Sequence, residues 1–312
     1  MLVELYAQTD VGRVRQGNED NFLVLDLAAE RSWTATDSAG APTEALHRFE
    51  VGGRGVVLLV SDGMGGALAG DVASRMAVET VRDMLSEEDA EGAASPQPDA
   101  ELPLAEVLSN ATKYANYAIH RKSLEDPRCS GMGATLTAAA VSSGLLALVQ
   151  VGDSRAYLIR GAQIKLVTKD QSLVQQLVDA QQITEEDAET HMFRNVILQA
   201  LGAQDELTPA ASSVALCRGD IALLCSDGLS GKLRAEEMHE IVAAAGGDLA
   251  AACDALIREA NRRGGEDNIT VVLARFDGDD LPAPAPGEIE VVKAPGGGFN
   301  YDTSEDDTSP IP

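Results

Sequence analysis

Four short apolar runs in close succession restrict the fold of this chain more than any other feature. They read ATLTAAAV, LLALVQVG, RAYLIR and QIKLVT, lie between Gly131 and Thr168, and are separated by only SSG, GDS and GA. Aliphatic runs bounded by Gly and Ser predict β-strands. Because a crossover helix needs a dozen or more residues, we expect each strand to pair antiparallel with the next. The pattern therefore argues against a doubly wound parallel sheet.

Two other apolar runs, far apart in the sequence, both end in Ser-Asp-Gly. VVLLV precedes the first copy, which contains Asp62, and IALLC precedes the second, which contains Asp227. One Asp-Gly after a strand is ordinary turn chemistry. Two copies favour a second interpretation, in which rigid strands direct acidic ligands into a cleft and each glycine allows the sharp turn that follows.

Acidic residues also stand beside two other predicted strands. Asn18-Glu19-Asp20 precedes a strand at 21–27, and Glu266-Asp267 precedes the last strand, at 269–276. One end of a β-sandwich could gather all four groups, and carboxylates brought together repel one another unless a cation lies between them. Hard divalent ions such as Mg²⁺ or Mn²⁺ prefer oxygen ligands.

The other polar residues agree with this interpretation. Arg15 lies three positions before Asn18, where its guanidinium could hold a phosphate by two parallel hydrogen bonds, although a solvated surface arginine is an equal alternative. The four histidines are isolated, form no zinc pattern and are expected to be surface or structural residues: His47, His120, His191 and His239.

Composition excludes several classes of function. The 312 residues carry a net charge of −26, which makes a nucleic-acid backbone an unlikely partner. No run approaches the roughly 18 apolar residues that span a membrane, and the first residues lack the features of a signal peptide. The four cysteines are scattered, as in reduced cytosolic proteins. We therefore expect a cytoplasmic, monomeric protein without membrane or nucleic-acid partners.

The remaining sequence outlines a single large domain and a tail. Helical spacing follows Gly70, returns at 104–123, and is found again at 235–244 and 249–263. The segment 28–54 has no clear periodicity and is expected to be a long excursion. Beyond Gly278 the chain is rich in Pro, Gly, Asp and Glu, a composition typical of disorder. The expected organisation is a domain at 1–277 and a disordered acidic tail at 278–312.

Six motifs in this order resemble the metal-dependent type 2C protein phosphatases (the PPM family), in particular their compact bacterial branch. They are VRQGNED, VSDGMGG, GMGATLTA, VGDSRAYLI, LLCSDGLS and GGEDNITVVL, and they span Ala7 to Phe276. The resemblance implies an α+β fold, a four-layer αββα sandwich of two antiparallel sheets flanked by helices. It also implies that residues 170–202 form a flap that shapes access for protein substrates.

The resemblance further implies a role for each site residue. Asp62 would bridge two divalent ions, Mn²⁺ or Mg²⁺, and the carbonyl of Gly63 would contact one of them. Asp227 and Asp267 would hold the first ion, and Glu19 and Asp20 the second, directly or through water. Asp62 and Arg15 would be the catalytic residues, with Arg15 on the substrate phosphate. Asp153, in the GDSR motif, would organise the turn and the outer shell.

The implied activity is hydrolysis of phosphoserine and phosphothreonine in proteins by a water that the two ions activate. The expected partners are phosphorylated proteins, namely serine/threonine kinases or their substrates. The alternative is a catalytically weak or silent relative that binds phosphoproteins or a regulatory partner. All three aspartates of the first ion and the bridge are present, which favours the active enzyme.

Three departures from the family pattern affect finer roles. Ala67 stands where many relatives have a histidine that is a candidate general acid. The nearest candidate for a third ion, with Asp227, is Asp126, which is slightly out of register. Gly231 occupies a position where an acidic residue is common. A third ion is therefore doubtful, and the 28–54 excursion exceeds the usual spacing.

Overall fold

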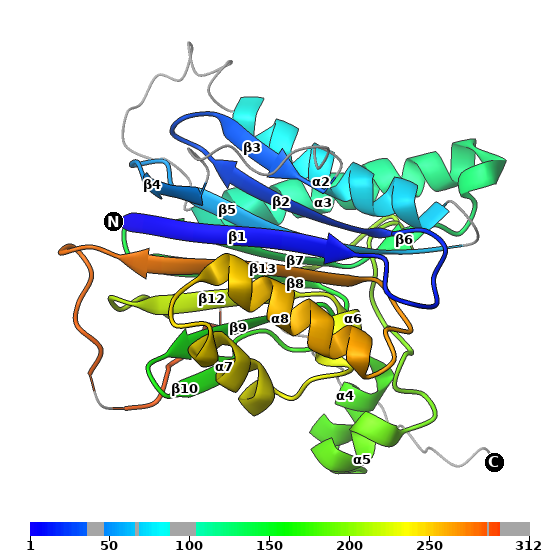
Figure 1. Ribbon diagram of the computed structural model, residues 1–312. Helices are drawn as coiled ribbons and strands as arrows, with labels where there is room; N and C mark the ends of the chain where they lie inside the picture. The colour runs from blue at the N-terminus through cyan, green and yellow to red at the C-terminus, as the bar shows by residue number, and fades with distance from the viewer. Residues whose placement is uncertain (36–46, 66–68, 88–103, 286, 294–312) are drawn as a thin grey trace, which may run out of the picture.

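Two antiparallel β-sheets pack face to face, and helices cover the outer face of each (Figure 1). The structure is a computed structural model that describes residues 1–35, 47–65, 69–87, 104–285 and 287–293. The two sheets and their flanking helices form four layers. The predicted fold class, α+β with an αββα order, is confirmed.

The six-stranded sheet contains the two chain segments that open and close the domain. In spatial order its strands are β10 (Gln163–Leu166), β9 (Arg155–Arg160), β12 (Asp220–Cys225), β13 (Ile269–Asp277), β1 (Leu2–Asp10) and β4 (Arg48–Glu50). Each neighbouring pair is antiparallel. β12 and β13 lie side by side, so the acidic residues that follow β12 and precede β13 emerge at the same edge.

The second sheet carries the other acidic strand ends. Its path is β14 (Val292–Lys293), β11 (Ala210–Ala215), β8 (Leu145–Val151), β7 (Leu136–Ser142), β5 (Val56–Met64), β2 (Asp20–Asp26) and β3 (Arg31–Thr34), with β6 (Gly133–Ala134) paired to β5 beside this path. In β5, Val56, Leu58 and Val60 face the other sheet, whereas Val57 and Leu59 lie beneath helices. This alternation fixes the register, because a slip of one residue would exchange the two faces.

Two pairs of helices form the outer layers. α2 (Ala69–Glu87) and α3 (Leu104–Glu125) cover the second sheet, and α7 (Ala235–Ala244) and α8 (Leu249–Arg262) cover the six-stranded sheet (Figure 1). The buried face of α8 repeats every three or four residues, as in an amphipathic helix. Within the described ranges, no helix combines the length and the apolar character needed to cross a membrane.

One predicted strand pairing is wrong. β7 pairs with β8, and β9 with β10, but β8 and β9 belong to different sheets. The three residues 152–154 carry the chain across the sandwich rather than through a hairpin. Gly152 makes this crossing possible, because its φ of 96° is left-handed and a Cβ there would lie 2.7 Å from the Thr135 side chain.

The expected flap contains two short helices, α4 (Leu173–Asp179) and α5 (Glu185–Thr190). A bridge between Ser172 and Ile197 joins the two ends of the flap to each other, and a bridge between Ala134 and Leu201 joins the flap to the domain. A 3₁₀ turn, η2 (Pro127–Cys129), follows α3, and a one-turn helix, α6 (Asp227–Ser230), follows β12. The 28–54 excursion contributes β3 and β4, and its residues 36–46 lie outside the described ranges.

The expectation of disorder from residue 278 onward is wrong for the described residues that follow it. Leu281 and Ile289 are buried in the core between the sheets, and β14 pairs with β11 at the sheet edge. Two apolar anchors and one strand pair offset the entropy of ordering a polar segment. Residues 294–312 of the expected tail lie outside the described ranges.

Candidate active site

The predicted acidic residues emerge at one edge of the sandwich, where strands of both sheets end. Asp20, the first residue of β2, is the direct cross-strand partner of Asp62 near the end of β5. Asp227 follows β12, and Asp267 precedes β13. We call Glu19, Asp20, Asp62, Asp227 and Asp267 the acidic cluster.

Asp20 is the most completely enclosed member of this cluster. The hydroxyls of Ser226 and Thr270 each donate a hydrogen bond of 2.7 Å to its Oδ2 atom, while Oδ1 is buried without a partner in the described part of the chain. Burial raises the pKa of Asp20 to about 7 against these two hydrogen bonds, and the charges of Asp227 and Asp267 raise it further. Two residues of the six-stranded sheet and its edge thus bind Oδ2 of Asp20, while Oδ1 has no partner among the described residues.

Asp62 is fixed through its backbone. Its N–H donates to Thr135 Oγ1 at 2.9 Å, and its carbonyl accepts from the Thr135 N–H at 2.8 Å. Burial raises the pKa of the Asp62 carboxyl well above its ordinary value, and the charges of Asp20, Asp227 and Asp153 act in the same direction. Side chains that repel each other this strongly converge only if something else compensates their charge.

Gly63 and Gly70 make room for the backbone next to Asp62. A Cβ on Gly63 would lie 2.1 Å from the carbonyl oxygen of Gly70, and one on Gly70 would lie 2.8 Å from the Glu19 carboxylate. The Gly63 N–H donates to the Glu19 carbonyl at 3.0 Å. The close approach of two glycines therefore lets β5, α2 and the segment before β2 meet.

Asp227 and Asp267 face this pair from the six-stranded sheet. Asp227 Oδ1 is buried and has no partner among the described residues. Burial and the charge of Asp267 raise the pKa of Asp227, whereas a hydrogen bond with the Asp62 carboxyl lowers it. The carboxylates of the two Ser-Asp-Gly copies are thus close enough to influence each other's pKa.

Glu19 lies at the open side of the cluster. Its N–H donates to Asn268 Oδ1 at 2.8 Å, and Asn268 Nδ2 donates to the carbonyls of Val11 and Gly17 at 2.9 Å. Burial raises the pKa of the Glu19 carboxyl, while the nearby Arg15 charge lowers it. Asn268 therefore positions the loop that carries both Arg15 and Glu19.

Arg15 is a half-exposed cation beside the cluster. Its Nη2 lies 2.8 Å from Asp267 Oδ2, and 50% of the side chain is exposed. The hydrogen bond to Asp267 raises the pKa of the guanidinium, and the charges of Glu19 and Asp62 raise it further. One carboxylate thus orients Arg15, while exposed guanidinium surface remains available for an anion.

The supporting hydroxyls and the asparagine were missed at the sequence level. Ser226, Thr270, Thr135 and Asn268 all contact cluster residues. Ser226 and Asn268 adjoin predicted ligands in the motifs SDG and EDN, so adjacency alone could have drawn attention to them. Thr135 lies 73 residues from Asp62 in the sequence, and only the pairing of the strands brings it there.

Asp126 is held by cations of its own. Its carboxylate pairs with Lys122 at 3.0 Å and Arg128 at 2.9 Å and caps η2 through the Arg128 N–H. The hydrogen bonds with Arg128 and Lys122 lower the pKa of Asp126 well below its usual range. No contact in the described ranges joins it to Asp227, so the structure does not bring the two candidate ligands of a third ion together.

Histidines and large cavities lie elsewhere. His120 contacts the Gly202 carbonyl, His239 the Gly161 carbonyl, His47 stacks on Tyr6, and His191 bonds to the Phe193 N–H.

Two cavities of about 200 and 210 Å³ open beside α7 and α8, and no cluster residue lines them. Charge rather than cavity shape identifies the site. The position of Ala67 lies outside the described residues.

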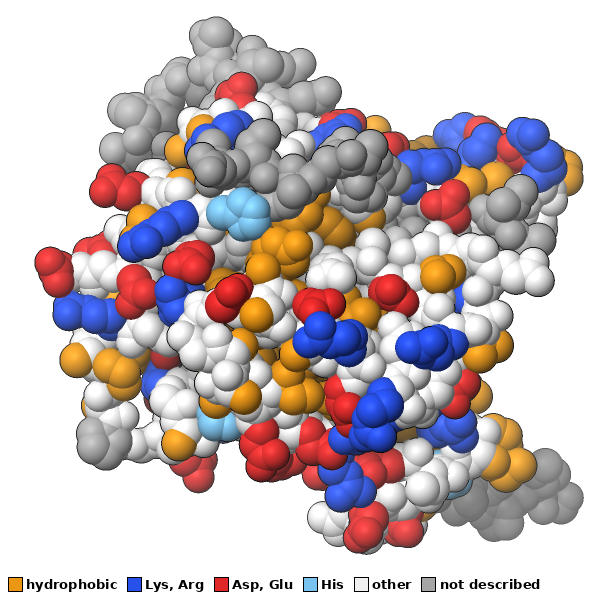
Figure 2. Space-filling model, in the orientation of Figure 1, with side chains coloured by type: hydrophobic (Ala, Val, Ile, Leu, Met, Phe, Trp, Pro, Cys, Tyr) orange, Lys and Arg blue, Asp and Glu red, His pale blue; other side chains and the backbone are white. Residues whose placement is uncertain are grey.

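Several surface carboxylates outside the cluster have arginine partners. Glu237 pairs with Arg263 at 2.7 Å, and Glu259 pairs with Arg262 at 2.6 Å and with Arg263 at 2.8 Å. These hydrogen bonds lower the pKa of each carboxyl to about 2. Figure 2 shows acidic and basic side chains side by side on this face. The raised pKa values of the cluster are therefore a local property rather than a result of the net charge.

The cluster fits hard divalent cations. It offers oxygen ligands alone, and Asp20 and Asp227 each have one buried carboxylate oxygen that accepts no hydrogen bond from the described residues. Among the described residues, no three acidic, histidine or cysteine side chains are already arranged as a complete set of metal ligands. The fit therefore follows from the donor chemistry and from buried carboxylates whose charge the chain itself leaves uncompensated.

A four-layer αββα sandwich with an acidic cluster and an arginine at one edge is the arrangement expected of the metal-dependent phosphatases. The sequence profile of the family described as protein phosphatase 2C matches residues 35–271, more than half of the chain. The chain belongs to the protein phosphatase 2C family. The predicted family is confirmed, and with it the predicted class of enzyme, a serine/threonine protein phosphatase.

Individual relatives agree with this family assignment. The serine/threonine phosphatase stp of Listeria monocytogenes is 35% identical over 270 residues, which cover 86% of this chain and 94% of that protein. The crystal structure of PstP/Ppp from Mycobacterium tuberculosis has a TM-score of 0.69 at 33% identity and covers 89% of this chain and 100% of that chain. The catalytic domain of PstP in complex with two manganese ions has a TM-score of 0.67 at 33% identity, with coverages of 89% and 99%.

Proposed function

We propose that this chain hydrolyses phosphoserine and phosphothreonine in phosphorylated proteins, with two divalent ions, Mn²⁺ or Mg²⁺, bound by the acidic cluster. One observation carries the proposal. Asp20 and Asp62, paired on adjacent strands, meet Asp227 from the opposite sheet, and two of these buried carboxylates have an oxygen without a partner in the described chain.

The supports around each side chain suggest how the ligands divide. Asp62 lies between Asp20 and Asp227 and is the residue suited to bridge both ions, next to the carbonyl of Gly63. Asp227 and Asp267 belong to the six-stranded sheet and would hold the first ion. Glu19 and Asp20 belong to the start of β2 and would hold the second.

The protein contributes orientation and charge. When bound, the two ions lower the pKa of a water molecule and neutralise charge on the phosphoryl group. Arg15, oriented by Asp267, would donate two parallel hydrogen bonds to equatorial phosphate oxygens. Ser226 and Thr270 hold Asp20 as a carboxylate acceptor in a buried place where a free carboxyl would keep its proton.

The leaving oxygen of serine or threonine must receive a proton. None of the four histidines contacts the acidic cluster within the described residues. We expect solvent to supply this proton, at a cost on the order of 10²-fold in rate compared with a positioned general acid.

The finer biological assignments extend this proposal. The substrates would be serine/threonine kinases or their targets, because an enzyme of this activity opposes kinases. We place the protein in the cytoplasm as a monomer, in keeping with its reduced cysteines and its paired surface charges. Asp126, neutralised by Lys122 and Arg128, takes no part in our two-ion site.

Hydrolysis of p-nitrophenyl phosphate and of a phosphothreonine peptide tests the proposal. Turnover should require Mn²⁺ or Mg²⁺, stop with EDTA, and fall at least 10³-fold in Asp227→Ala, since several kcal/mol of charge stabilisation are lost. The matched control is Asp26→Ala, at the opposite end of β2, which should retain turnover per folded molecule. If the wild type bound the phosphopeptide without hydrolysing it, the silent binding module would replace this function.

A further inference from the structure

Thr9 and Thr270 are cross-strand partners on β1 and β13, at the end of these strands that lies beside the acidic cluster. Their hydroxyl oxygens are 2.7 Å apart, and Thr270 Oγ1 donates to Asp20 Oδ2 at 2.7 Å. A hydroxyl has one proton to donate, and a carboxylate can only accept. Because the proton of Thr270 points to Asp20, the Thr9 hydroxyl must donate to Thr270.

Asn18 fixes the direction of the Thr9 hydroxyl. Its Nδ2 donates to Thr9 Oγ1 at 2.8 Å, and its Oδ1 accepts from the Asp20 N–H at 3.1 Å. Since an amide nitrogen only donates, the proton of Thr9 remains directed at Thr270. The chain of hydrogen bonds therefore runs in one direction, from Asn18 through Thr9 and Thr270 to Oδ2 of Asp20. It begins and ends on Asp20, whose N–H holds Asn18.

A second, shorter chain ends on the same oxygen. The Thr270 N–H donates to Ser226 Oγ at 3.0 Å, and Ser226 Oγ donates to Asp20 Oδ2 at 2.7 Å. Oδ2 thus accepts from two hydroxyls that are themselves held by other hydrogen bonds, whereas Oδ1 is buried without a partner in the described chain. Hydrogen bonds in series polarise one another, so such chains favour an ionised carboxylate more than a single hydroxyl does.

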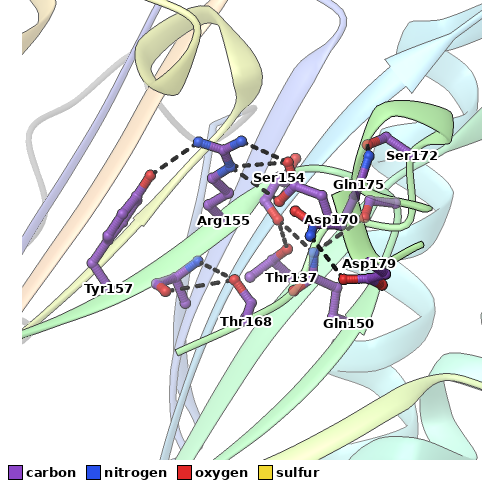
Figure 3. A network of polar contacts seen from close by, with 12 residues as sticks. Thr137, Gln150, Ser154, Arg155, Tyr157, Thr168, Asp170, Ser172, Gln175 and Asp179 are labelled. Carbon is purple, nitrogen blue, oxygen red and sulfur yellow. Dashed lines mark hydrogen bonds and ion pairs between the residues drawn. The ribbon is translucent and has the colours of Figure 1, made fainter. Parts of the chain in front are cut away.

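The polar network beside the crossing between the sheets differs from this chain. There the Thr137 hydroxyl donates to the Ser154 carbonyl at 2.7 Å, and Asp170 in the same network forms an ion pair of 2.7 Å with Arg155 (Figure 3). These contacts end on a backbone group or on a carboxylate that already has its cation, so they fix the fold of the crossing. The chain from Asn18 ends instead on a carboxylate with one oxygen that no described residue contacts by a hydrogen bond.

We propose that Thr9 and Asn18 are positioning residues of the cation site, because their chain holds Thr270 so that Asp20 presents Oδ1 to a divalent ion, directly or through one water. This inference rests on the proposed two-ion function. Neither residue would touch the ion or the substrate, and both act through Thr270. Through them β1 and the loop that carries Arg15 take part in holding the second ion.

The first test measures Mn²⁺ binding without catalysis, by isothermal titration calorimetry of metal-free protein. Thr9→Val replaces the hydroxyl with a methyl group of similar size and should weaken one class of sites by about 10-fold or more, as observed for residues that support metal ligands. Thr9→Ser restores the hydroxyl and should bind as the wild type does. The control is Thr112→Val, because Thr112 is a fully buried threonine of α3 whose hydroxyl donates to the Leu108 carbonyl at 2.8 Å.

Thr112→Val should bind Mn²⁺ like the wild type. Unchanged affinity in Thr9→Val, an equal loss in Thr112→Val, or failure of Thr9→Ser to restore binding would overturn the inference. Asn18→Ala keeps the test valid if Thr9→Val does not fold, since it removes the first donor of the chain from a partly exposed position. It should weaken the same class of sites by a smaller factor, and normal binding by folded Asn18→Ala would count against the inference in the same way.

The second test separates positioning from catalysis. Because the chain acts through the ion, excess Mn²⁺ should restore kcat of Thr9→Val close to the wild-type value, while the Mn²⁺ concentration for half-maximal turnover rises. A kcat that stays low at saturating Mn²⁺ would refute the inference. If the wild type bound no Mn²⁺, the two-ion function would fail as well. If the wild type bound Mn²⁺ and turned over substrate but the variants matched it, only this inference would fail.

Discussion

β2 and β12 each have one aspartate near each end. The aspartates at the two ends differ in whether an arginine forms an ion pair with them. Away from the cluster, Asp26 of β2 pairs with Arg31 at 2.8 Å, and Asp220 of β12 pairs with Arg160 at 2.7 Å. At the cluster, Asp20 of β2 and Asp227 after β12 form no ion pair within the described residues, and each has a buried oxygen without a partner.

The difference separates structural acids from functional acids on the same strands. Asp220 is fully buried, yet the chain supplies its cation and three hydrogen bonds, two from Arg160 and one from the Cys217 N–H. Asp20 is almost as buried and receives hydroxyls in place of a cation. Burial alone therefore does not mark a candidate metal ligand; burial without a protein cation does.

The largest effect should come from the bridge of the cluster. Asp62→Asn should lower kcat/KM with Mn²⁺ by about 10³-fold or more, because several kcal/mol of cation-derived stabilisation would be lost. The metal-free variant should still fold, with a melting temperature at or above that of the wild type. Steady-state kinetics and thermal unfolding check both statements, and an active Asp62→Asn would break the distinction between the two strand ends.

At the opposite end, the expected effect falls on stability. Arg160→Ala leaves Asp220 buried without its cation, which should cost about 3–5 kcal/mol of unfolding free energy. Urea unfolding measures this loss, and Mn²⁺ should not restore it. Activity per folded molecule should stay within about twofold of the wild type, because no contact of Arg160 reaches the cluster. Rescue by Mn²⁺ would contradict the comparison.

pH should distinguish the metal-free protein from the loaded one. Asp20 has a pKa of about 7 in the fold, above its ordinary value, and Asp62 is raised as well. Such groups stabilise the fold while protonated, so metal-free stability should be highest at low pH and decline as pH rises through about 7. With Mn²⁺ this decline should disappear, since the ion favours the ionised form. Melting curves from pH 5 to 8, with EDTA or Mn²⁺, test the reversal.

The smallest effect is expected for Arg15, the cation that the chain itself places beside the cluster. Arg15→Lys keeps the charge beside Asp267 but removes the planar fork, and should lower kcat/KM by about tenfold. Melting temperature should change little, because half of the Arg15 side chain is exposed. A fall in stability comparable to that of Arg160→Ala would show that Arg15 is structural.

Sequence patterns predicted much of this arrangement because the relevant signals are local. The alternation of β5, the spacing of α8 and the acidic strand ends are each contained within a few residues. The convergence of Asp62 and Asp227 was inferred from the repeated Ser-Asp-Gly, and in the structure each carboxylate influences the pKa of the other. The metal roles assigned to individual residues remain proposals.

The predictions failed where the answer depends on distant parts of the chain. A three-residue gap between strands permits either a hairpin or a crossing between sheets, and the contacts of Gly152 with Gln171 decide for the crossing. Composition could not show that Leu281 and Ile289 would find places in the core.

The strand pair between β14 and β11 has a practical consequence for anyone who shortens this protein. A chain cut at residue 277 would lose Leu281 and Ile289 from the interior and leave β11 with unpaired backbone groups along one side, a template for self-association. A chain that ends after Lys293 keeps β14 paired with β11. The smallest fragment that keeps this packing is therefore longer than the family motifs and includes residues 278–293.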